Sequence, residues 1–328
     1  MKAIALFSGG LDSCLAIKII QDMGIDVEAV YINTGFDSNV DKTEYLYYMA
    51  KEIGVKLTII DERLHFINDI LFSPKYGYGK NMNPCIDCHA NMINVAYDYM
   101  KEVGAKFIIS GEVLGQRPMS QKIDGIRKIE KLTNKDIVVR PLSAKLLPPT
   151  LPERNGWIDR NKLYDISGRE RKRQMELAEK FGLKNYESPA GGCLLTDKHF
   201  SIKLKNYVKY LNLGIEEIEI LKVGRFLVVD DKIVIISRNK DENSILKSYN
   251  GDKFLKMYPI GFAGPVGLLQ KDALYNTKQL SAQILLTYSK ATEGIVGIAG
   301  ENFEVKRLKS KDEIKKFMKF WYNLMNIK

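Results

Sequence analysis

The sequence predicts an α/β fold in which a doubly wound parallel sheet is followed by a smaller α+β domain. Short apolar runs alternate with stretches of helical periodicity through the first part of the chain. A glycine-rich loop joins the first apolar run to the first helical stretch. After Asp197 the pattern changes to paired β-branched runs. We therefore expect one domain at residues 1–199 and a second at residues 200–328.

Three apolar runs, residues 2–7, 27–33 and 56–60, have the composition of buried parallel strands. Between them, residues 14–24 and 42–53 carry apolar side chains at helical spacing. Parallel strands need crossover connections, and these are usually helices that cover the faces of the sheet. The alternation therefore predicts a sheet with helices on both sides.

The loop between the first strand and the first helix has the sequence SGGLDS. Gly9 and Gly10 allow the backbone to approach an anion closely, and the N–H groups at the helix start can bind phosphate. Ser8 and Ser13 add hydroxyl donors, and Asp12 can hold the Mg²⁺ that accompanies a nucleotide. A plain turn is the alternative, but six specified residues between a strand and a helix favour a phosphate site.

A fourth apolar run, residues 107–110, leads into the polar loop GEVLGQRPMSQ at residues 111–121. Ligands bind at the carboxyl ends of strands in this architecture. The residues of this loop that we assign to ligand contacts are Gly111, Glu112, Gln116, Ser120 and Gln121. At the end of the second strand, Tyr31, Asn33 and Thr34 occupy an equivalent position. The alternative for each loop residue is a hydrogen bond within its own turn.

The segment after this loop is expected to contain a strand at residues 138–142 and a turn or flap, not a helix, at the proline-rich residues 145–153. Ser167 is expected to cap a helix at residues 168–181. That helix begins with a basic group: Arg169, Arg171, Lys172 and Arg173. These side chains could contact nucleic-acid phosphates or simply face water.

Four cysteines are too few for a disulfide framework and are better suited to metal or sulfur chemistry. Cys85 and Cys88 form a C-x₂-C pair before a helix expected at residues 90–103, and a turn there would converge both sulfurs. Cys193 lies in the glycine-rich sequence PAGGC, which suits a loop that projects a thiol. Cys14 is assigned to packing.

Several roles for the three cysteines remain open. Zinc would need a fourth ligand, for which His89 and His199 are available. A [4Fe–4S] cluster on three cysteines would leave one iron without a protein ligand. Cys85 and Cys193 could instead act as persulfide carrier and resolving thiol, or all three could be buried apolar groups. Asp87 could orient a ligand or face water, and His65 is assigned a structural role.

The last third of the chain begins with a hairpin at residues 223–237, in which two β-branched runs flank an Asp-Asp turn. A basic helical stretch follows at 240–249, and further helices are expected at 280–290 and 310–324. Such a mixture predicts a small α+β domain.

The net charge of +10 is unevenly distributed. Acidic residues outnumber basic ones in residues 1–114, whereas basic residues outnumber acidic ones by 15 to 7 in residues 115–173 and by 23 to 15 in residues 194–328. A basic surplus favours a polyanionic partner. No apolar run is long enough to cross a membrane, and the N-terminus lacks the features of a signal peptide, so we expect a cytoplasmic protein without membrane contact.

The SGGLDS motif resembles the PP-loop of the N-type ATP pyrophosphatases. This resemblance implies that Ser8, Gly9, Gly10, Asp12 and Ser13 hold the pyrophosphate end of ATP, with Mg²⁺ as a second cofactor. It also implies cleavage between the α- and β-phosphates, which adenylates a carbonyl oxygen. The position of Asn33, Gly111 and Gln116 implies further contacts to the nucleotide.

The GEVLGQRPMSQ loop closely resembles the 4-thiouridine tRNA synthetases of the ThiI type. Several tRNA thiolases of the same superfamily combine a C-x₂-C pair with one distant cysteine. That resemblance implies a [4Fe–4S] cluster on Cys85, Cys88 and Cys193, with zinc as the alternative. No THUMP or rhodanese domain of the ThiI pattern is evident, so sulfur must come through these cysteines or from another protein.

The segment ISRNKDENSILKS resembles the GRN-x-x-EN signature of the NFACT-type RNA-binding domain. The matching residues are Arg238, Asn239, Glu242 and Asn243, while Ser237 replaces the usual glycine. The resemblance implies an RNA-binding domain. A lid or a dimerisation domain is the alternative, and a homodimer is compatible with the sequence.

These observations predict an AMP- and pyrophosphate-forming tRNA sulfurtransferase. ATP would adenylate a uridine carbonyl, at C4 in our preferred hypothesis, and sulfur would arrive through Cys85 and Cys193 with Asp12 supporting catalysis. The expected partners are tRNA and a sulfur donor, either sulfide or a persulfide carrier charged by a cysteine desulfurase. The alternatives are a PP-loop ligase or amidotransferase with structural zinc, and a non-catalytic RNA-binding protein.

Overall fold

A computed structural model of the chain describes residues 1–186 and 192–318. It contains two compact units, Met1–Thr196 and Asp197–Lys328. The predicted boundary at residue 199 lies within helix α8 (Lys198–Tyr207), which belongs to the second unit. Each unit is described by itself.

The first unit is built on a five-stranded parallel sheet with the order β3-β2-β1-β4-β5. The strands are β1 (Lys2–Leu6), β2 (Asp26–Asn33), β3 (Leu57–Asp61), β4 (Phe107–Ser110) and β5 (Val138–Val139). Strand β1 is central and pairs in parallel with β2 and β4. The chain therefore runs outward from β1 in both directions, as the predicted doubly wound fold requires.

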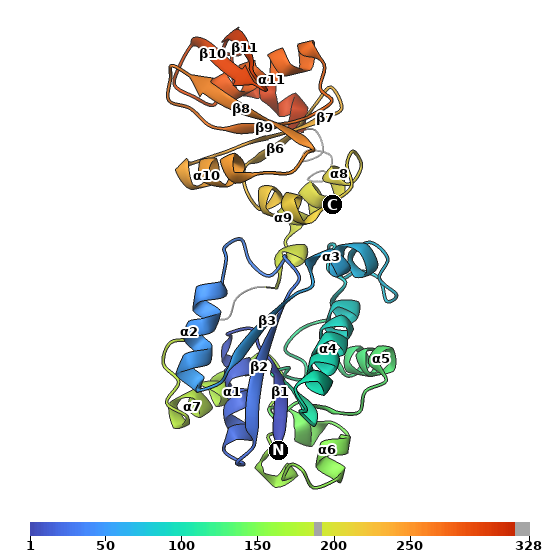
Figure 1. Ribbon diagram of the computed structural model, residues 1–328. Coiled ribbons are helices and arrows are strands. Elements are labelled where there is room, and N and C mark those ends of the chain that lie inside the picture. Colours follow the sequence, from blue (N-terminus) through green and yellow to red (C-terminus); the bar gives the residue numbers. More distant parts are fainter. Residues whose placement is uncertain (187–191, 319–328) are drawn as a thin grey trace. The chain divides into compact units, whose positions relative to one another are not determined.

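Helices cover both faces of this sheet (Figure 1). One face of the sheet shares an apolar core with three helices: α1 (Leu11–Gln21), α2 (Thr43–Ile53) and α7 (Lys172–Lys180). The other face packs against α4 (Cys85–Glu102), which in turn contacts α5 (Ile123–Thr133). The amphipathic spacing of these segments explains the two layers, because each helix buries one apolar stripe. Helix α2 ends at Gly54, whose φ of 72° supplies the left-handed cap.

Short elements complete the first unit. They are α3 (Arg63–His65), the π-helical η1 (Phe66–Leu71), η2 (Ala144–Leu146), α6 (Leu151–Arg154), η3 (Arg160–Lys162) and η4 (Leu194–Thr196). Helix α6 corrects our expectation of no helix in residues 145–153. Thr150 and Glu153 form a capping box there, and Pro152 is tolerated because it lies in the first turn.

Two helix starts also differ from the prediction. Helix α4 begins at Cys85, five residues earlier than expected, and Pro84 occupies the N-cap position just before it. Proline disfavours the helical conformation of the residue before it, so the helix does not extend further toward the N-terminus. Helix α7 begins at Lys172, so Ser167 is not its cap. Gly168 instead adopts a φ of 84°, and its N–H donates to Leu114 O at 2.7 Å, which delays the helix by one turn.

The second unit contains a six-stranded antiparallel sheet with the order β11-β10-β8-β9-β7-β6. Its strands are β6 (Arg225–Val229), β7 (Lys232–Ile236), β8 (Phe254–Ile260), β9 (Gly267–Gln270), β10 (Glu293–Ile298) and β11 (Glu301–Lys306). The predicted hairpin is confirmed, since β6 and β7 pair around Asp230 and Asp231, both with positive φ.

Helix α11 (Tyr275–Thr287) packs on one face of this sheet, and α8, α9 (Ile215–Lys222) and α10 (Lys240–Ser248) lie on the other side (Figure 1). The expected helix at 310–324 is present only as α12 (Asp312–Lys315) and the following η5 (Lys316–Met318). The rest of that segment lies outside the described residues.

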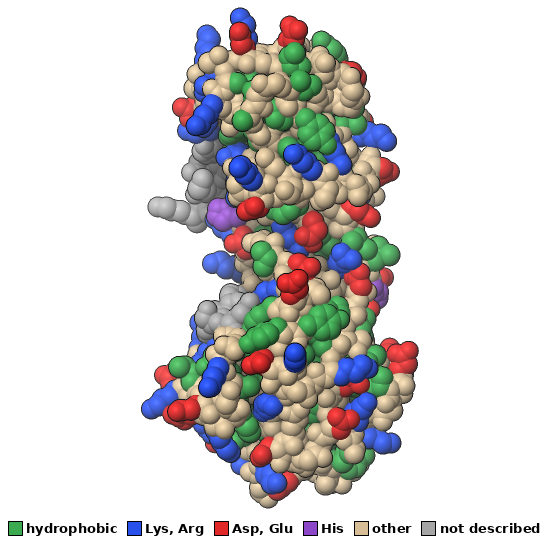
Figure 2. Space-filling model, turned by 60° about the vertical axis from the view of Figure 1, so that its left-hand side comes forward, with side chains coloured by type: hydrophobic (Ala, Val, Ile, Leu, Met, Phe, Trp, Pro, Cys, Tyr) green, Lys and Arg blue, Asp and Glu red, His purple; other side chains and the backbone are tan. Residues whose placement is uncertain are grey.

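No helix in the described part of the chain is long and apolar enough to cross a membrane. On the surface that Figure 2 shows, basic and acidic side chains are interspersed over both units. The basic surplus of the sequence is therefore not gathered into one large patch among the described residues of that face.

Candidate nucleotide and sulfur site

The SGGLDS loop lies between the end of β1 and the start of α1, as the sequence predicts. Gly9 has a φ of 73°, and a Cβ there would lie 2.9 Å from the ring of Tyr45, whose hydroxyl donates to Gly9 O at 3.0 Å. Ser13 Oγ donates to Gly10 O at 2.8 Å and lies 3.3 Å from Ser8 Oγ. The hydroxyls of Ser8 and Ser13 thus fix the conformation of the loop. Because the loop precedes the N-terminus of α1, it can bind an anion there.

Gly111 brings the second predicted loop against the first. A Cβ at this position would lie 2.7 Å from the backbone N of Ser13 and 2.7 Å from the carbonyl carbon of Asp12. Only glycine fits such an approach. The end of β4 therefore forms a wall of the phosphate loop.

Asp12 is held by residues from distant parts of the chain. Gln116 Nε2 donates to Asp12 Oδ2 at 2.7 Å, and Arg171 Nη2 lies 3.3 Å from the same oxygen. Gln174 Nε2 in turn donates to Gln116 Oε1 at 3.3 Å. Asp12 Oδ1 is buried and has no hydrogen-bond partner among the described residues. This free carboxylate oxygen fits the ligand chemistry of Mg²⁺.

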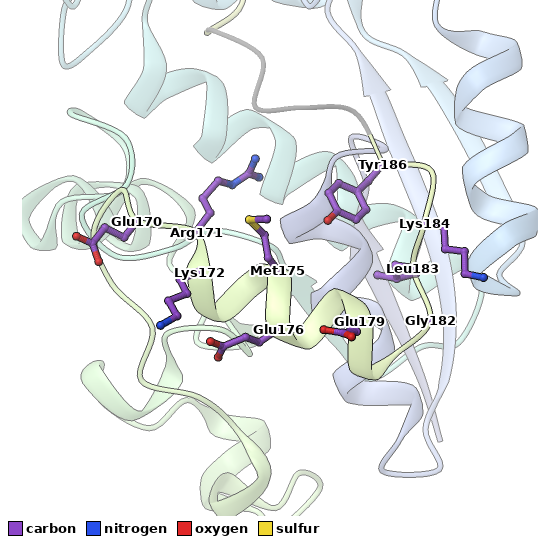
Figure 3. Close-up of a pocket in the computed structure, with 10 residues that line it drawn as sticks. All are labelled: Glu170, Arg171, Lys172, Met175, Glu176, Glu179, Gly182, Leu183, Lys184 and Tyr186. Carbon is purple, nitrogen blue, oxygen red and sulfur yellow. The ribbon is translucent and has the colours of Figure 1, made fainter.

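Arg171 is a site residue that the sequence reasoning placed elsewhere, among residues for RNA phosphates. It lies directly before α7, and its side chain points to the opposite side from that of Lys172 (Figure 3). Arg171, Lys172 and Met175 all line a hollow of about 770 Å³ beside α7, and Arg171 also borders the cavity at the phosphate loop. Arg173 instead pairs with Asp165 on the surface at 2.7 Å. The four basic side chains therefore do not act together, because Arg171 contacts the phosphate loop whereas Arg173 forms a surface ion pair.

A cavity of about 710 Å³ opens beside these loops, within the range of ligand pockets. Its walls include Ser8, Gly10, Asp12, Ser13, Tyr31, Thr34, Gly111, Glu112, Gln116, Ser120, Gln121 and Arg169. Gly9 and Asn33 are not among the lining residues. Asn33 Oδ1 accepts from the N–H of Gly35 at 2.9 Å, which is a local turn.

Cys85, Cys88 and Cys193 line this same cavity. Cys85 and Cys88 are one turn apart on α4, not in a turn before a helix as expected. Cys193 comes from the distant segment before η4, where the N–H of Leu194 donates to Phe36 O at 2.8 Å. Pro189, which we expected to shape this loop, lies outside the described residues. The fold thus unites the three cysteines that the sequence singled out.

The three thiols have different surroundings. Burial raises the pKa of the Cys88 thiol well above its usual value, and the nearby Cys193 raises it further. Burial and the nearby Cys85 raise the pKa of Cys193 to about 11. Cys85 differs because Asn83 Nδ2 donates to its sulfur at 3.1 Å. The sulfur of Cys193 interacts instead with the backbone N–H groups of Leu195 and Thr196, which lower its pKa but do not outweigh burial.

The cysteines do not form a ready metal site. Among the described residues, no group of three or more His, Cys, Asp or Glu side chains could hold a metal ion. His89, one candidate for a fourth zinc ligand, uses Nδ1 to contact Glu112, and His199 belongs to the second unit. The sulfur donors fit a soft metal or a persulfide by their chemistry, but their arrangement does not match a closed ligand sphere.

His89 and Glu112 line the same cavity as the thiols, and the buried Arg140 contacts Glu112. His89 Nδ1 lies 2.7 Å from Glu112 Oε1, and Arg140 Nε donates to Glu112 Oε2 at 2.8 Å. Burial alone would raise the pKa of Glu112, but the charge of Arg140 and the hydrogen bond from His89 lower it to about 2. The sequence pointed to Glu112, but nothing in it paired this carboxylate with His89.

Other singled-out residues have structural roles. Asp87 accepts from the backbone N–H groups of Lys75 at 2.7 Å and Tyr76 at 3.1 Å, so it orders the preceding loop. His65 contacts Asp69 and Asn91. Cys14 is buried, and burial raises its pKa to about 12, in keeping with packing.

The four signature residues of the second unit shape the turn between β7 and α10. Asn239 caps α10 by accepting from the N–H of Glu242 at 2.9 Å, and Arg238 Nε donates to Glu242 Oε1 at 2.8 Å. Asn243 Oδ1 accepts from the hydroxyl of Ser237 and from the N–H of Val266. Ser237, which replaces the usual glycine, is thereby part of this network.

The fold and the loop define the first unit as a PP-loop type of nucleotide-binding domain, joined to a second α+β unit. Residues 1–145 match the family model described as thiamine biosynthesis protein (ThiI), and residues 224–318 match that of the NFACT protein RNA binding domain. The two family models thus match separate segments of the chain, one in each unit.

Curated relatives include tRNA-specific 2-thiouridylases. That of Marinobacter nauticus is 26% identical over 227 residues, which cover 63% of this chain and 54% of the relative. That of Desulfosudis oleivorans is 28% identical over 109 residues, which cover 32% of this chain and 30% of the relative. An uncharacterized protein of Methanocaldococcus jannaschii is 30% identical over 113 residues, covering 34% and 41%. The chain spans about half or less of the length of these relatives.

Two solved structures show a partial likeness. A 4-thiouridine synthetase in complex with RNA and bound ATP aligns with a TM-score of 0.39 and 22% identity, over 66% of this chain and 53% of that one. A predicted subunit of a tRNA methyltransferase from Methanocaldococcus jannaschii aligns with a TM-score of 0.36 and 18% identity. The alignment covers 55% of this chain and 76% of that one.

Proposed function

We propose that this protein is an ATP-dependent tRNA sulfurtransferase that forms AMP and pyrophosphate. The observation that carries the proposal is a single cavity lined by both the phosphate loop and three thiols. Such a cavity can activate a carbonyl with ATP and deliver sulfur to the same carbon. The ThiI family match and the thiouridylase relatives support this chemistry.

The first half-reaction is assigned to the loops around Asp12. Backbone N–H groups at the start of α1, with Ser8 and Ser13, would bind the phosphates released as pyrophosphate. Asp12 Oδ1 would hold Mg²⁺, which neutralises the leaving group. A uridine oxygen, at C4 in our proposal, bonds to the α-phosphorus while the bond to the β-phosphate oxygen breaks and N3 loses its proton.

The second half-reaction is assigned to the cysteines. Sulfur attacks the activated carbon, and AMP leaves with the original oxygen. A [4Fe–4S] cluster on Cys85, Cys88 and Cys193 would supply hydrosulfide when bound. In the alternative, the outer sulfur of a persulfide on Cys85 would bond to the carbon, and the Cys193 thiolate would then attack the Cys85 sulfur and break the S–S bond. The Cys85–Cys193 disulfide left behind would be reduced by an external thiol. The hydrogen bond from Asn83 would orient a sulfur at Cys85 in either case. The second unit would bind RNA, as its NFACT-type match suggests.

The test compares two cysteine variants. Cys85→Ala should reduce thionucleoside formation in tRNA, measured by mass spectrometry with sulfide and ATP, by at least about 100-fold, as for loss of an essential nucleophile. Cys14→Ala is the matched control, because that thiol is buried outside the cavity. Wild-type thiolation by Cys85→Ala would contradict the proposal. ATP cleavage with a small acceptor and no RNA would instead support a ligase.

The source of sulfur is tested by metal analysis of protein purified without oxygen. About four irons and four sulfides per chain would support the cluster. One zinc per chain would contradict it and favour the ligase. Absence of both metals would favour the persulfide route.

A further inference from the structure

Helix α5 and its two flanks carry a row of basic side chains that the proposed chemistry does not use. Within residues 122–136, the basic row consists of Lys122, Arg127, Lys128, Lys131 and Lys135. Among the described residues, none of these five forms an ion pair with a carboxylate. Two of the three carboxylates in the same stretch are occupied, since Glu130 contacts Arg140 at 3.4 Å and Asp136 pairs with Arg154. The stretch therefore presents a positive charge that a polyanion can neutralise.

Two tyrosines hold part of the basic row in place. Lys128 Nζ lies 5.4 Å from the centroid of the Tyr76 ring, and Lys135 Nζ lies 4.0 Å from that of Tyr97. An ammonium group over an aromatic ring is attracted to the ring, but its charge is not neutralised. The rings therefore position these two lysines and leave their charge available for a partner.

The same tyrosines connect the basic row to the cavity. The N–H of Tyr76 donates to Asp87 Oδ2 at 3.1 Å, in the first turn of α4, where Cys85 lines the cavity. Tyr97 lies ten residues after Asp87 on the same helix, which corresponds to about 15 Å at 1.5 Å per residue. Helix α5 packs against α4 along this length (Figure 1). The basic row therefore begins near the thiol end of the cavity and extends away from it.

We propose that the basic row binds the RNA phosphates beside the nucleotide that enters the cavity, so that the first unit contacts tRNA itself. The inference rests on the proposed function, which brings one nucleotide of a large polyanion to this cavity. Lysine contacts to phosphates position a nucleic acid without reading its sequence. Within α5, Ile123 is the one exposed large apolar side chain, so this surface suits phosphates better than a membrane.

The test compares tRNA binding by two matched double variants of the full chain. Lys128→Gln with Lys131→Gln removes two charges from the basic row, and glutamine preserves the helix because its helix propensity is close to that of lysine. Lys51→Gln with Lys180→Gln is the control, since both lysines are exposed on α2 and α7, at the opposite face of the sheet. Lys180 also matches Lys128 in its contact, because its Nζ lies 5.4 Å from the centroid of the Phe181 ring.

Binding is measured by fluorescence anisotropy over a series of salt concentrations. Each lost phosphate contact lowers the slope of log affinity against log salt by about 1. The variant of the basic row should therefore lose about 2 from this slope, whereas the control should keep the wild-type slope. A wild-type slope in the variant of the basic row would overturn the inference and would indicate that these lysines face water or an acidic protein. Thermal melting identifies a variant that fails to fold.

Lysine footprinting tests the same surface in the wild-type protein, where no substitution can disturb the fold. The protein is acetylated briefly with and without tRNA, and mass spectrometry quantifies the modification of each lysine. Bound tRNA should protect Lys128, Lys131 and Lys135 and leave Lys51 and Lys180 as reactive as before. An equal change at all five lysines, or no change at any of them, would overturn the inference.

Thiolation of the same tRNA, measured in parallel with ATP and sulfide, separates this inference from the proposed function. Binding that depends on the basic row, in a wild-type protein that forms no thionucleoside, would refute the proposed function and retain the inference. Thionucleoside formation with the same KM for tRNA in the wild type and in the variant of the basic row would do the reverse. No measurable binding of tRNA by the wild type would overturn both.

Discussion

At the scale of single residues, the contact between Arg171 and Asp12 in the phosphate loop can be tested by substitution. Arg171 reaches Asp12 Oδ2 from the start of α7, and its own side chain is 18% exposed. Arg171→Ala should weaken ATP binding by roughly tenfold or more, since hydrogen bonds to charged groups are worth about 1.5–3 kcal/mol. Isothermal titration with ATP and Mg²⁺ measures the change.

Arg173 provides the matched control for this variant. It lies two residues further on and pairs with Asp165 on the surface. Arg173→Ala should therefore leave ATP affinity near that of the wild type. Equal losses in both variants would show that general positive charge, and not the contact with Asp12, supports binding.

Single residues also show where sequence reasoning reaches its limit. The phosphate loop was predictable because Ser8 to Ser13 act within one continuous motif. The contacts of Asp12 with Arg171 and of His89 with Glu112 were not, because each joins separate segments whose approach depends on the fold. Asp87 shows the opposite error, because a polar residue inside a motif can simply order the backbone.

At the scale of secondary structure elements, the turn before α10 tests whether a residue of the matched signature stabilises the fold. The matched signature residue Asn239 caps the helix. Asn239→Ala should lower the free energy of unfolding by about 1 kcal/mol, as is typical for loss of an N-cap. Urea denaturation measures this change. Ser244→Ala, within the same helix but exposed, should have little effect, and an equal loss there would contradict the capping role.

Strand β2 carries the residue with the clearest pH dependence away from the cavity. Burial alone would raise the pKa of Glu28, but hydrogen bonds from Lys56, Tyr99 and Lys2 outweigh it and lower the pKa to about 2. The ionised form is therefore favoured by folding. Its contribution to stability is present above the unfolded pKa of about 4.3 and is lost as the pH falls through 2.

Glu28→Gln tests this contribution. The variant should be less stable than the wild type by about 1 kcal/mol at pH 7, because three partly exposed donors lose a buried, charged acceptor. The difference should shrink as the pH falls from about 4.3 to 2, when measured by urea denaturation across that range. A difference that stays constant would contradict the assigned pKa.

The elements themselves were largely predictable, and their ends were not. Apolar runs identified the strands, since a strand buried on both faces has few polar residues. The starts of α4 and α7 depended on Pro84 and Gly168, whose effects on local backbone geometry override the wider periodicity.

At the scale of the whole molecule, a unit with a phosphate loop is followed by a unit that matches the model of the NFACT protein RNA binding domain. The doubly wound sheet places the loops after β1, β2 and β4 at one edge, and the cavity lies among them. Topology of this kind explains why three cysteines from two distant segments meet near the phosphate loop. The identity of the sulfur carrier was not predictable, because the same thiols suit several sulfur species.

The central claim is that one cavity couples ATP cleavage to sulfur transfer. The most direct measurement is the stoichiometry of AMP, pyrophosphate and thionucleoside formed by the full chain with tRNA and a sulfide source. We expect equal amounts of all three products, and no AMP when RNA is withheld. Thionucleoside formed without ATP, or ATP cleaved to ADP and phosphate, would contradict it.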